Sequence, residues 1–421
     1  MIQHSNHDEG GGRRSSLAIS SQTYVKNDNK LTSLHVLNYD PLFYINDDSL
    51  SNRENKGNMY VTKRLSEYQK NPSELTSLPT EGPNSGVLVI QDEESRTPCC
   101  FGKCFDWKLH GLPFPQNTKV TVRFQVGKVV YLDPVAFIPV LHQPLSSNLY
   151  YVIRQSGKHT GFIPDADPRP LDPFDIYQQF EIHQRGSSNQ KFFATSVASE
   201  GIPPQFLTRK GWVAASLPFE EYGLIDDAKG VVDAKLRYEL PDLDKSVVVG
   251  KWYVPFLFVK EGGDANDQMN KSMYYSMTLQ KRFEEVFFCE NIGNNKHFEV
   301  VVDVEVETEV VKLEGDKIAR ETKGVNSDGV VWFSVSGTQK IGLGSVVLER
   351  MKWEEERFGW SKKDELRSSI KRTEKFEGGG PHWKSYRCYV LVETFELKRT
   401  DGSLVLTYEF KHVDKLKSKW D

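Results

Sequence analysis

The chain has 421 residues, of which 38% are hydrophobic and 12% aromatic. This supply of large side chains is enough for a packed core, so a wholly disordered chain is excluded. The 54 basic residues are balanced by 58 acidic ones, whereas a sequence-independent grip on nucleic acid needs a basic surplus, so we expect no nucleic-acid partner.

The sequence carries no signal for secretion or membrane insertion. No run of about 18 apolar residues predicts a membrane-spanning helix, and the first residues lack the apolar stretch of a secretory signal. The five cysteines are an odd number, and three of them crowd into residues 99–104, unlike a disulfide framework. We therefore expect a cytoplasmic protein with no transmembrane segment, for which peripheral contact with a membrane is left open.

Residues 1–58 are dominated by Ser, Asn, Asp and Gly. They show no sustained apolar period, so we predict a disordered N-terminal extension. Within it, Ser15 and Ser16 follow the pair Arg13-Arg14, a pattern typical of basophilic kinase sites, where phosphate would add charge. The alternative is a chance basic pair in a disordered tail.

Residues 59–260 are predicted to form a β-rich N-terminal domain that contains the cysteine cluster. Thr62, followed by Leu65 and Tyr68, indicates the start of a short helix. Alternating or dense apolar runs predict strands. The expected strands cover residues 87–90, 120–126, 149–154, 192–197 and 252–259.

Segment 261–271 is polar and contains two glycines, so we expect a linker to a C-terminal antiparallel β domain over 272–421. Strict alternation over 298–310 predicts one long strand with an apolar face and a solvated acidic face. Asp401-Gly402 is typical of a hairpin turn. The remaining strands are expected at 329–336, 386–398 and 404–412.

One helix is predicted near 345–357, within this antiparallel sheet. Val347 and Met351 lie one helical turn apart on its apolar side, and Glu349 and Lys352 lie on the wetter side. The predicted fold class is therefore mainly β, a β-rich α+β fold with long antiparallel strands and a few short helices.

The segment with the most reactive and metal-ligating side chains is Cys99-Cys100-Phe101-Gly102-Lys103-Cys104. Its three thiols can bind zinc if His110 supplies a fourth ligand, although the usual C-x2-C spacing is absent. Clustered thiols are also substrates for S-acylation or redox chemistry. A third interpretation is that Cys99, Cys100 and Cys104 are small residues that pack a tight turn. We predict no cofactor, and the identity of any metal is left open.

Several short strings resemble a plant family known as domain of unknown function 1262. They occur at residues 59–62, 81–86, 99–102, 112–117, 175–180, 349–357 and 401–406, which read MYVT, EGPNSG, CCFG, LPFPQN, DIYQQF, ERMKWEEER and DGSLVL. The resemblance runs from Met59 to the C-terminus and implies a plant origin and a stress- or defence-associated role. It supplies no catalytic residue. Relatives carry a second cysteine-rich segment near 161–169, which is short and cysteine-free here, so a paired metal site is in doubt.

Three functions compete. We favour a non-catalytic β-rich protein that binds an unidentified protein or small-molecule ligand. The first alternative is a membrane-active protein with elongated strands like those of aerolysin, suggested by the long strand at 298–310. The second is an unrecognised hydrolase or transferase that uses His142, His159 or the cysteine cluster, although no catalytic motif joins them.

Overall fold

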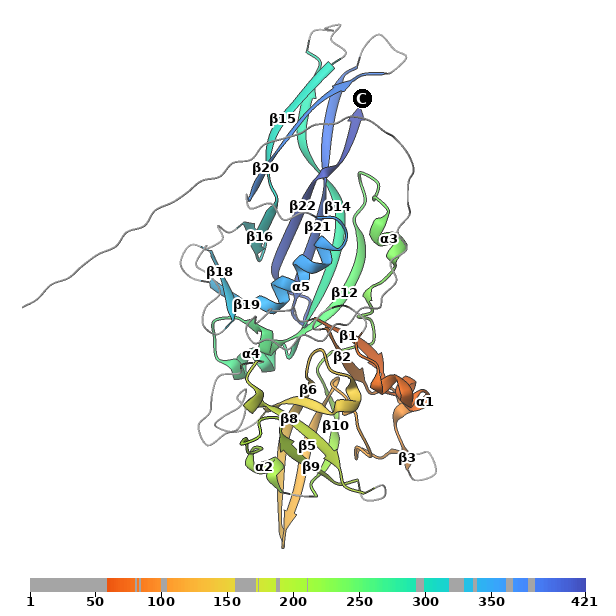
Figure 1. The fold of residues 1–421 in the computed structure, drawn as a ribbon, viewed down its shortest axis with the longest axis vertical. Coiled ribbons are helices and arrows are strands. Elements are labelled where there is room, and N and C mark those ends of the chain that lie inside the picture. Colours follow the sequence, from red (N-terminus) through yellow and green to blue (C-terminus); the bar gives the residue numbers. More distant parts are fainter. Residues whose placement is uncertain are drawn as a thin grey trace, which may run out of the picture. The chain divides into compact units, whose positions relative to one another are not determined.

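The computed structural model describes residues 59–421 apart from 80–81, 83–84, 100–103, 156–171, 173, 187–189, 210, 293–298, 318–328, 336–338, 361–365 and 378–382. The predicted disordered extension over 1–58, with Ser15 and Ser16, therefore lies outside the described residues. Within the described part the fold is β-rich, with antiparallel sheets and five α-helices (Figure 1). The predicted fold class is confirmed.

The largest sheet has nine strands. In spatial order they are β17 (Asp316–Lys317), β16 (Glu309–Leu313), β22 (Leu404–Trp420), β21 (Ser385–Lys398), β14 (Tyr274–Glu290), β12 (Val247–Pro255), β1 (Met59–Arg64) and β2 (Ser85–Ile90), with β11 (Gly230–Val231) also beside β12. The β1–β2 pair is parallel, and the other pairs in this sheet are antiparallel.

A second sheet has six strands, in the order β10 (Val213–Glu221), β5 (Thr118–Val126), β6 (Val129–Pro139), β7 (Leu149–Arg154), β8 (Gln179–Gln184) and β9 (Phe192–Ser196). There are also three smaller sheets in the described part. One has three strands, in the order β13 (Val259–Lys260), β19 (Gln339–Gly344) and β18 (Val330–Val335). The other two are strand pairs, β15 (Glu299–Glu307) with β20 (Arg367–Lys375) and β3 (Pro98–Cys99) with β4 (Cys104–Phe105). The strands predicted near 87–90, 120–126, 149–154, 192–197 and 329–336 are thereby confirmed.

The α-helices are α1 (Leu65–Lys70), α2 (Gln205–Thr208), α3 (Ala234–Tyr238), α4 (Ala265–Lys271) and α5 (Ser345–Glu356). Single 3-10 turns occur at Pro72–Thr76, Glu93–Ser95, Leu145–Ser147, Ile176–Gln178 and Phe256–Phe258. The helix predicted near 345–357 is confirmed as α5. The first helix starts later than predicted, because Thr62 lies in β1, where its hydroxyl accepts from Ala228 N.

Strand β14 is central to the large sheet and extends over 17 residues. Alternate side chains along its first half, including Tyr275, Met277, Leu279 and Phe283, are buried, as expected for a strand whose side chains point to opposite faces in turn. Lys281 occupies one of these buried positions because its ammonium donates to two backbone carbonyls at α3. This charge in an apolar row explains why the strand was not predicted.

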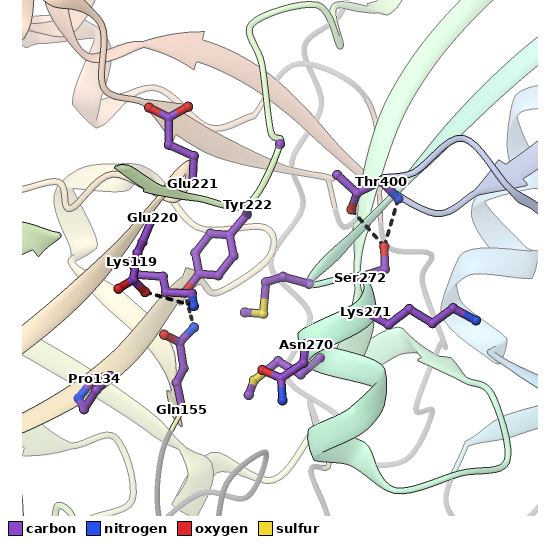
Figure 2. Close-up of a pocket in the computed structure, with 13 residues that line it drawn as sticks. Lys119, Pro134, Gln155, Glu220, Glu221, Tyr222, Asn270, Lys271, Ser272 and Thr400 are labelled. Carbon is purple, nitrogen blue, oxygen red and sulfur yellow. Dashed lines mark hydrogen bonds and ion pairs between the residues drawn. The ribbon is translucent and has the colours of Figure 1, made fainter. Parts of the chain in front are cut away.

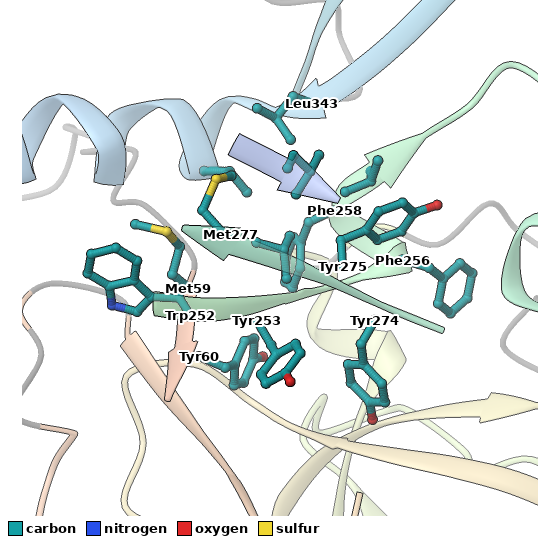
Figure 3. Close-up of a cluster of buried hydrophobic side chains, with 14 of the residues drawn as sticks. Met59, Tyr60, Trp252, Tyr253, Phe256, Phe258, Tyr274, Tyr275, Met277 and Leu343 are labelled. Atoms are coloured by element: carbon teal, nitrogen blue, oxygen red, sulfur yellow. The ribbon is translucent and has the colours of Figure 1, made fainter. Parts of the chain in front are cut away.

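The main hydrophobic core joins both large sheets (Figure 3). Trp252, Phe258 and Tyr275 pack in it with Ile138 and Tyr151 of the six-stranded sheet. A separate cluster covers the other face of that sheet and includes Phe114, Val120, Val122, Phe137 and Trp212. The six-stranded sheet is therefore buried on both faces where it meets the rest of the fold.

The predicted division at 261–271 does not coincide with a break between sheets. Strands β1, β2 and β12 precede it in the chain, yet they share the nine-stranded sheet with β14, β21 and β22. The segment itself forms α4, and Gln268 in α4 donates to Val259 O at 2.7 Å and Tyr275 Oη at 3.0 Å. Polar composition suggested a linker here, whereas these polar side chains anchor a helix to both neighbouring strands.

The strand predicted over 298–310 is present but changes partner at Thr308. Residues Glu299–Glu307 pair with β20, and Glu309–Leu313 pair with β22. The predicted burial pattern is confirmed: Val300, Val302 and Val306 are buried, and the acidic residues between them face solvent or are partly covered. Strand β20 was not predicted, because its sequence RSSIKRTEK has almost no apolar residues.

The C-terminal hairpin matches its prediction closely. Strands β21 and β22 are joined through Asp401-Gly402, and Gly402 has φ +84°, a left-handed conformation that favours glycine. Strand β22 extends to Trp420, eight residues past the predicted end at His412, because its backbone keeps pairing with β21 as far as Tyr386↔Trp420 although the apolar alternation stops.

Candidate functional site

The structure brings two of the three predicted thiol positions together at the level of the backbone. Cys99 in β3 is the register partner of Cys104 in β4, across a short antiparallel pair. Cys100 lies outside the described residues. His110, suggested as a fourth zinc ligand, has its Nε2 atom 3.1 Å from Asp106 Oδ2. Zinc binding, S-acylation and simple packing at this cluster all stay predictions.

A more complete candidate site is a cavity of about 490 Å³ beside α4, which we call the α4 pocket (Figure 2). One wall comes from the six-stranded sheet and the segments that follow its strands. The other comes from the end of α4, the start of β14 and the β21–β22 turn. Its lining residues are Lys119, Pro134, Gln155, Glu220, Glu221, Tyr222, Gly223, Met269, Asn270, Lys271, Ser272, Met273 and Thr400.

The first wall is held by polar contacts. Lys119 on β5 pairs with Glu220 on β10, with 3.0 Å between Nζ and Oε2. Gln155 donates from Nε2 to the phenol oxygen of Tyr222, and the Tyr222 ring packs edge-on against Tyr274 with centroids 5.8 Å apart. Burial raises the pKa of Tyr222, so its phenol stays a neutral hydrogen-bonding group at ordinary pH.

The second wall is built on α4. Asp264 caps this helix by accepting from Asn266 N at 2.8 Å. The last turn contributes Asn270 and Lys271 to the lining, and Met269 and Met273 supply a buried apolar floor. This wall thus combines exposed polar side chains with a floor made of two methionine side chains.

Ser272 is the pocket residue most like a nucleophile, but its hydroxyl is already engaged. Its Oγ donates to Tyr274 O at 2.5 Å and accepts from Thr400 N at 3.1 Å. The described lining contains no histidine or cysteine to act as a general base or second nucleophile. The arrangement is suited to holding a ligand.

Gly223 is required where the two walls meet. Its φ is +69°, and a Cβ at this position would lie 2.3 Å from the Thr400 methyl carbon. Only glycine satisfies both the left-handed backbone and this close approach. Gly223 therefore lets the chain after β10 run against the β21–β22 turn.

A second polar constellation is fully buried, and we call it the buried charge cluster: Arg237, Glu355, Glu393 and His412, from α3, α5, β21 and β22. His412 Nε2 lies 3.0 Å from both Glu355 Oε2 and Glu393 Oε2. Arg237 pairs with Glu393 and, at 3.2 Å, with Glu355 Oε1.

Glu355, Glu393 and His412 also form the one group of metal-ligand type among the described residues, with ligand atoms within 4.8 Å of one another. Arg237 contacts both carboxylates, so a cation bound by these ligand atoms would compete with a buried guanidinium. Buried charges are stable only when paired, and this cluster is paired internally. We interpret it as a structural element that fixes α3 and α5 to the sheet.

Neither constellation was predicted from sequence. The pocket residues are scattered over segments between positions 119 and 400, with no recurring spacing. A local signal did exist for α4. Asp264 is a favourable N-cap residue, and the sequence ANDQMNK that follows it can form a short helix. For the buried charge cluster, the helix over 345–357 was predicted without any role for Glu355, because the partners of Glu355 lie far away in the sequence.

Comparisons with known proteins give limited information. Residues 81–166 match a family described as "Protein of unknown function (DUF1262)". This supports a domain of unknown function over that stretch, in agreement with the resemblance found there. No curated protein matches the chain.

Among solved structures, the chain is similar to "Crystal structure of Cry35Ab1", with 13% identity and a TM-score of 0.43. The alignment covers 73% of this chain and 90% of that chain. None of the described helices is long and apolar enough to cross a membrane.

Proposed function

We propose that this protein is a non-catalytic binding protein that holds a small polar ligand in the α4 pocket. The observation that carries the proposal is the cavity of about 490 Å³, a size within the range of roughly 300–1,000 Å³ typical of small-molecule sites. A ligand with hydroxyl, amide or carboxylate groups would match its lining.

Three features of the pocket support this ligand class. Asn270 offers an exposed amide with both donor and acceptor atoms. Lys271 and Lys119 supply positive charge on opposite walls, and each lies near a carboxylate: Lys271 Nζ is 3.9 Å from Glu261 Oε2, and Lys119 Nζ is 3.0 Å from Glu220 Oε2. The Met269 and Met273 floor can contact the carbon skeleton of the ligand.

The test is a thermal-shift screen of sugars, amino acids and small carboxylates, followed by titration calorimetry of any compound that raises Tm. We expect one chemical class to bind saturably, and Asn270→Trp to reduce its affinity at least ten-fold by filling the cavity mouth. Asp267→Trp is the matched control, because it places an indole on the same helix at an exposed residue outside the lining.

Two results would contradict the proposal. One is the absence of binding for every class up to millimolar concentration. The other is a compound that binds wild type and Asn270→Trp with the same Kd, since its site would then lie elsewhere.

A membrane-active protein with aerolysin-like elongated strands is a second candidate. The observation in its favour is the length of β14 and β22, which extend over 17 residues each. Incubation with dye-loaded anionic vesicles tests it, and no leakage at micromolar protein would remove it. The hydrolase or transferase alternative gains no support from the α4 pocket, whose described lining lacks His142 and the thiols.

We further propose a plant protein that resides in the cytoplasm and has a stress- or defence-related role. The family match over 81–166 and the free thiols of Cys289 and Cys388 support this setting, since reducing compartments keep thiols unpaired. Imaging of a tagged protein in plant cells, with transcript measurement under stress, tests both parts. An extracellular signal or unchanged transcript would contradict the corresponding part.

A further inference from the structure

The β5–β6 hairpin exposes a concentrated group of large apolar side chains at its end. We define the hairpin tip as residues 123–132. Within it Val126, Val129, Val130, Tyr131 and Leu132 have exposed fractions between 41% and 62%. Isolated exposed apolar residues are common on proteins, but a contiguous group of five marks a contact surface.

The tip projects because its neighbouring strands end earlier (Figure 1). Pairing of β10 with β5 reaches only Val213↔Arg123, and pairing of β7 with β6 reaches only Arg154↔Val135. Beyond these positions the two strands pair only with each other, from Phe124↔Tyr131 to Val126↔Val129. The turn is made at Gly127, with φ +57° and open space around it.

The register gives the tip two different faces. Directly opposite residues in an antiparallel pair share a face, and successive residues alternate. Phe124 with Tyr131, and Val126 with Val129, therefore form one face on which the hairpin itself places only apolar and aromatic side chains. The other face carries Arg123 with Leu132 and Gln125 with Val130, and so mixes charge with apolar surface.

The charge around the tip is positive. Residues 118–132 contain no Asp or Glu. Arg123 and Lys128 are exposed, and Arg209 stacks over the Phe124 and Tyr131 rings at 4.8 and 4.9 Å. None of these three cations forms an ion pair with a described residue, whereas Asp133, at the base of the projection, is paired with Arg154 at 2.7 Å.

We propose that the hairpin tip docks on an anionic lipid surface. Apolar side chains would enter the headgroup region, and the cations would contact lipid phosphates. Both kinds of contact are typical of segments that anchor a protein at a membrane interface. A protein partner fits less well, because a stable interface needs about 800 Å² on each side and the projecting part is a two-stranded ribbon. A bilayer accepts a narrow tip without a shaped receptor.

The test is co-sedimentation of the full chain with vesicles of phosphatidylcholine alone or with 30% phosphatidylserine. Wild type should sediment with the anionic vesicles only, and less so at higher salt. Lys128→Glu should weaken binding about thirty-fold, because each unit of charge at such a surface changes affinity about five-fold. Val129→Ser combined with Leu132→Ser should abolish binding.

Matched controls separate the tip from general surface changes. Val301→Ser alters a valine on β15 that is more exposed than those of the tip, and Lys371→Glu reverses an exposed lysine on β20. Both variants should bind like wild type. These positions are exposed, so the folded state should survive every change, as far-UV circular dichroism can verify.

Insertion has its own readout. A tryptophan introduced by Val130→Trp should be quenched by brominated anionic lipid beyond the signal of the eight native tryptophans, and one introduced by Val301→Trp should not. Failure of wild type to sediment, equal binding to neutral vesicles, or equal loss in the controls would overturn the proposal. The outcome is independent of ligand binding in the α4 pocket.

Discussion

The buried charge cluster and the β15–β20 ribbon use the same residue types in opposite settings. In the cluster, Arg237, Glu355 and His412 are buried and within hydrogen-bonding distance of their partners. In the ribbon, exposed or half-buried acidic residues of β15 face exposed basic residues of β20 across the register. These cross-strand pairs are Glu299–Lys375, Asp303–Lys371 and Glu307–Arg367.

From this difference we expect burial, rather than the number of ion pairs, to determine how much each pair contributes to the free energy of unfolding. Removal of one partner from a buried pair leaves an uncompensated charge in an apolar medium. At an exposed pair, water and salt replace the lost partner at little cost. Three substitutions of decreasing burial should reveal this gradient.

The largest effect is expected for Arg237→Ala. It leaves Glu355 and Glu393 buried with only His412 between them, and we expect a loss of about 3–5 kcal/mol in the free energy of unfolding. Urea denaturation followed by tryptophan fluorescence measures this value. A loss below about 1 kcal/mol would mean that the cluster is hydrated and comparable to the ribbon.

An intermediate effect is expected for Glu349→Gln on α5. Burial raises the pKa of Glu349 to about 7, and its Oε2 has no hydrogen-bond partner among the described residues. In the unfolded chain this carboxyl titrates near 4.5. The folded state therefore binds more protons between these values, and wild-type stability should fall as pH rises from about 4.5 to 7.

Glutamine stays neutral, so Glu349→Gln should remove this pH dependence and stabilise the protein at pH 8. The side chain is only partly buried, which limits the gain to about 1 kcal/mol after solvent screening. Tm measured from pH 4.5 to 8 for wild type and variant checks the slope. Parallel profiles would show that another group titrates in this range.

The smallest effect is expected for Lys371→Ala on the ribbon. Its Nζ lies 3.4 Å from Asp303 Oδ2, and both side chains are at least 60% exposed. We expect a change of at most about 0.5 kcal/mol that vanishes in 0.5 M salt. A salt-independent loss near that of Arg237→Ala would contradict the gradient.

The sequence predicted those elements in which the spacing of apolar residues, or the turn residues, matches the secondary structure that the backbone adopts. The alternation of valines with acidic residues gave β15, and Asp401-Gly402 gave the final hairpin. Apolar spacing around Val347 and Met351 located α5. The same spacing could not show that Glu355 in α5 is buried, because the partners of Glu355 come from α3, β21 and β22.

Other elements were missed because tertiary contacts override local pattern. Strand β14 has Lys281 and Arg282 at its centre, and only the α3 carbonyls make the buried Lys281 acceptable. The α4 pocket depends on segments separated by up to 281 positions, from Lys119 to Thr400. Such proximity is a property of the topology and leaves no motif along the chain.

The pairing of β14 with β21 also has a consequence during synthesis. The two strands align from Ser276↔Lys398 to Glu290↔Ser385, yet residues 291–384 must be made between them. Until β21 leaves the ribosome, β14 offers a long row of unpaired backbone donors and acceptors, and such an edge recruits other chains. Nascent chains that stall within 291–384 would therefore be the ones that most need a chaperone.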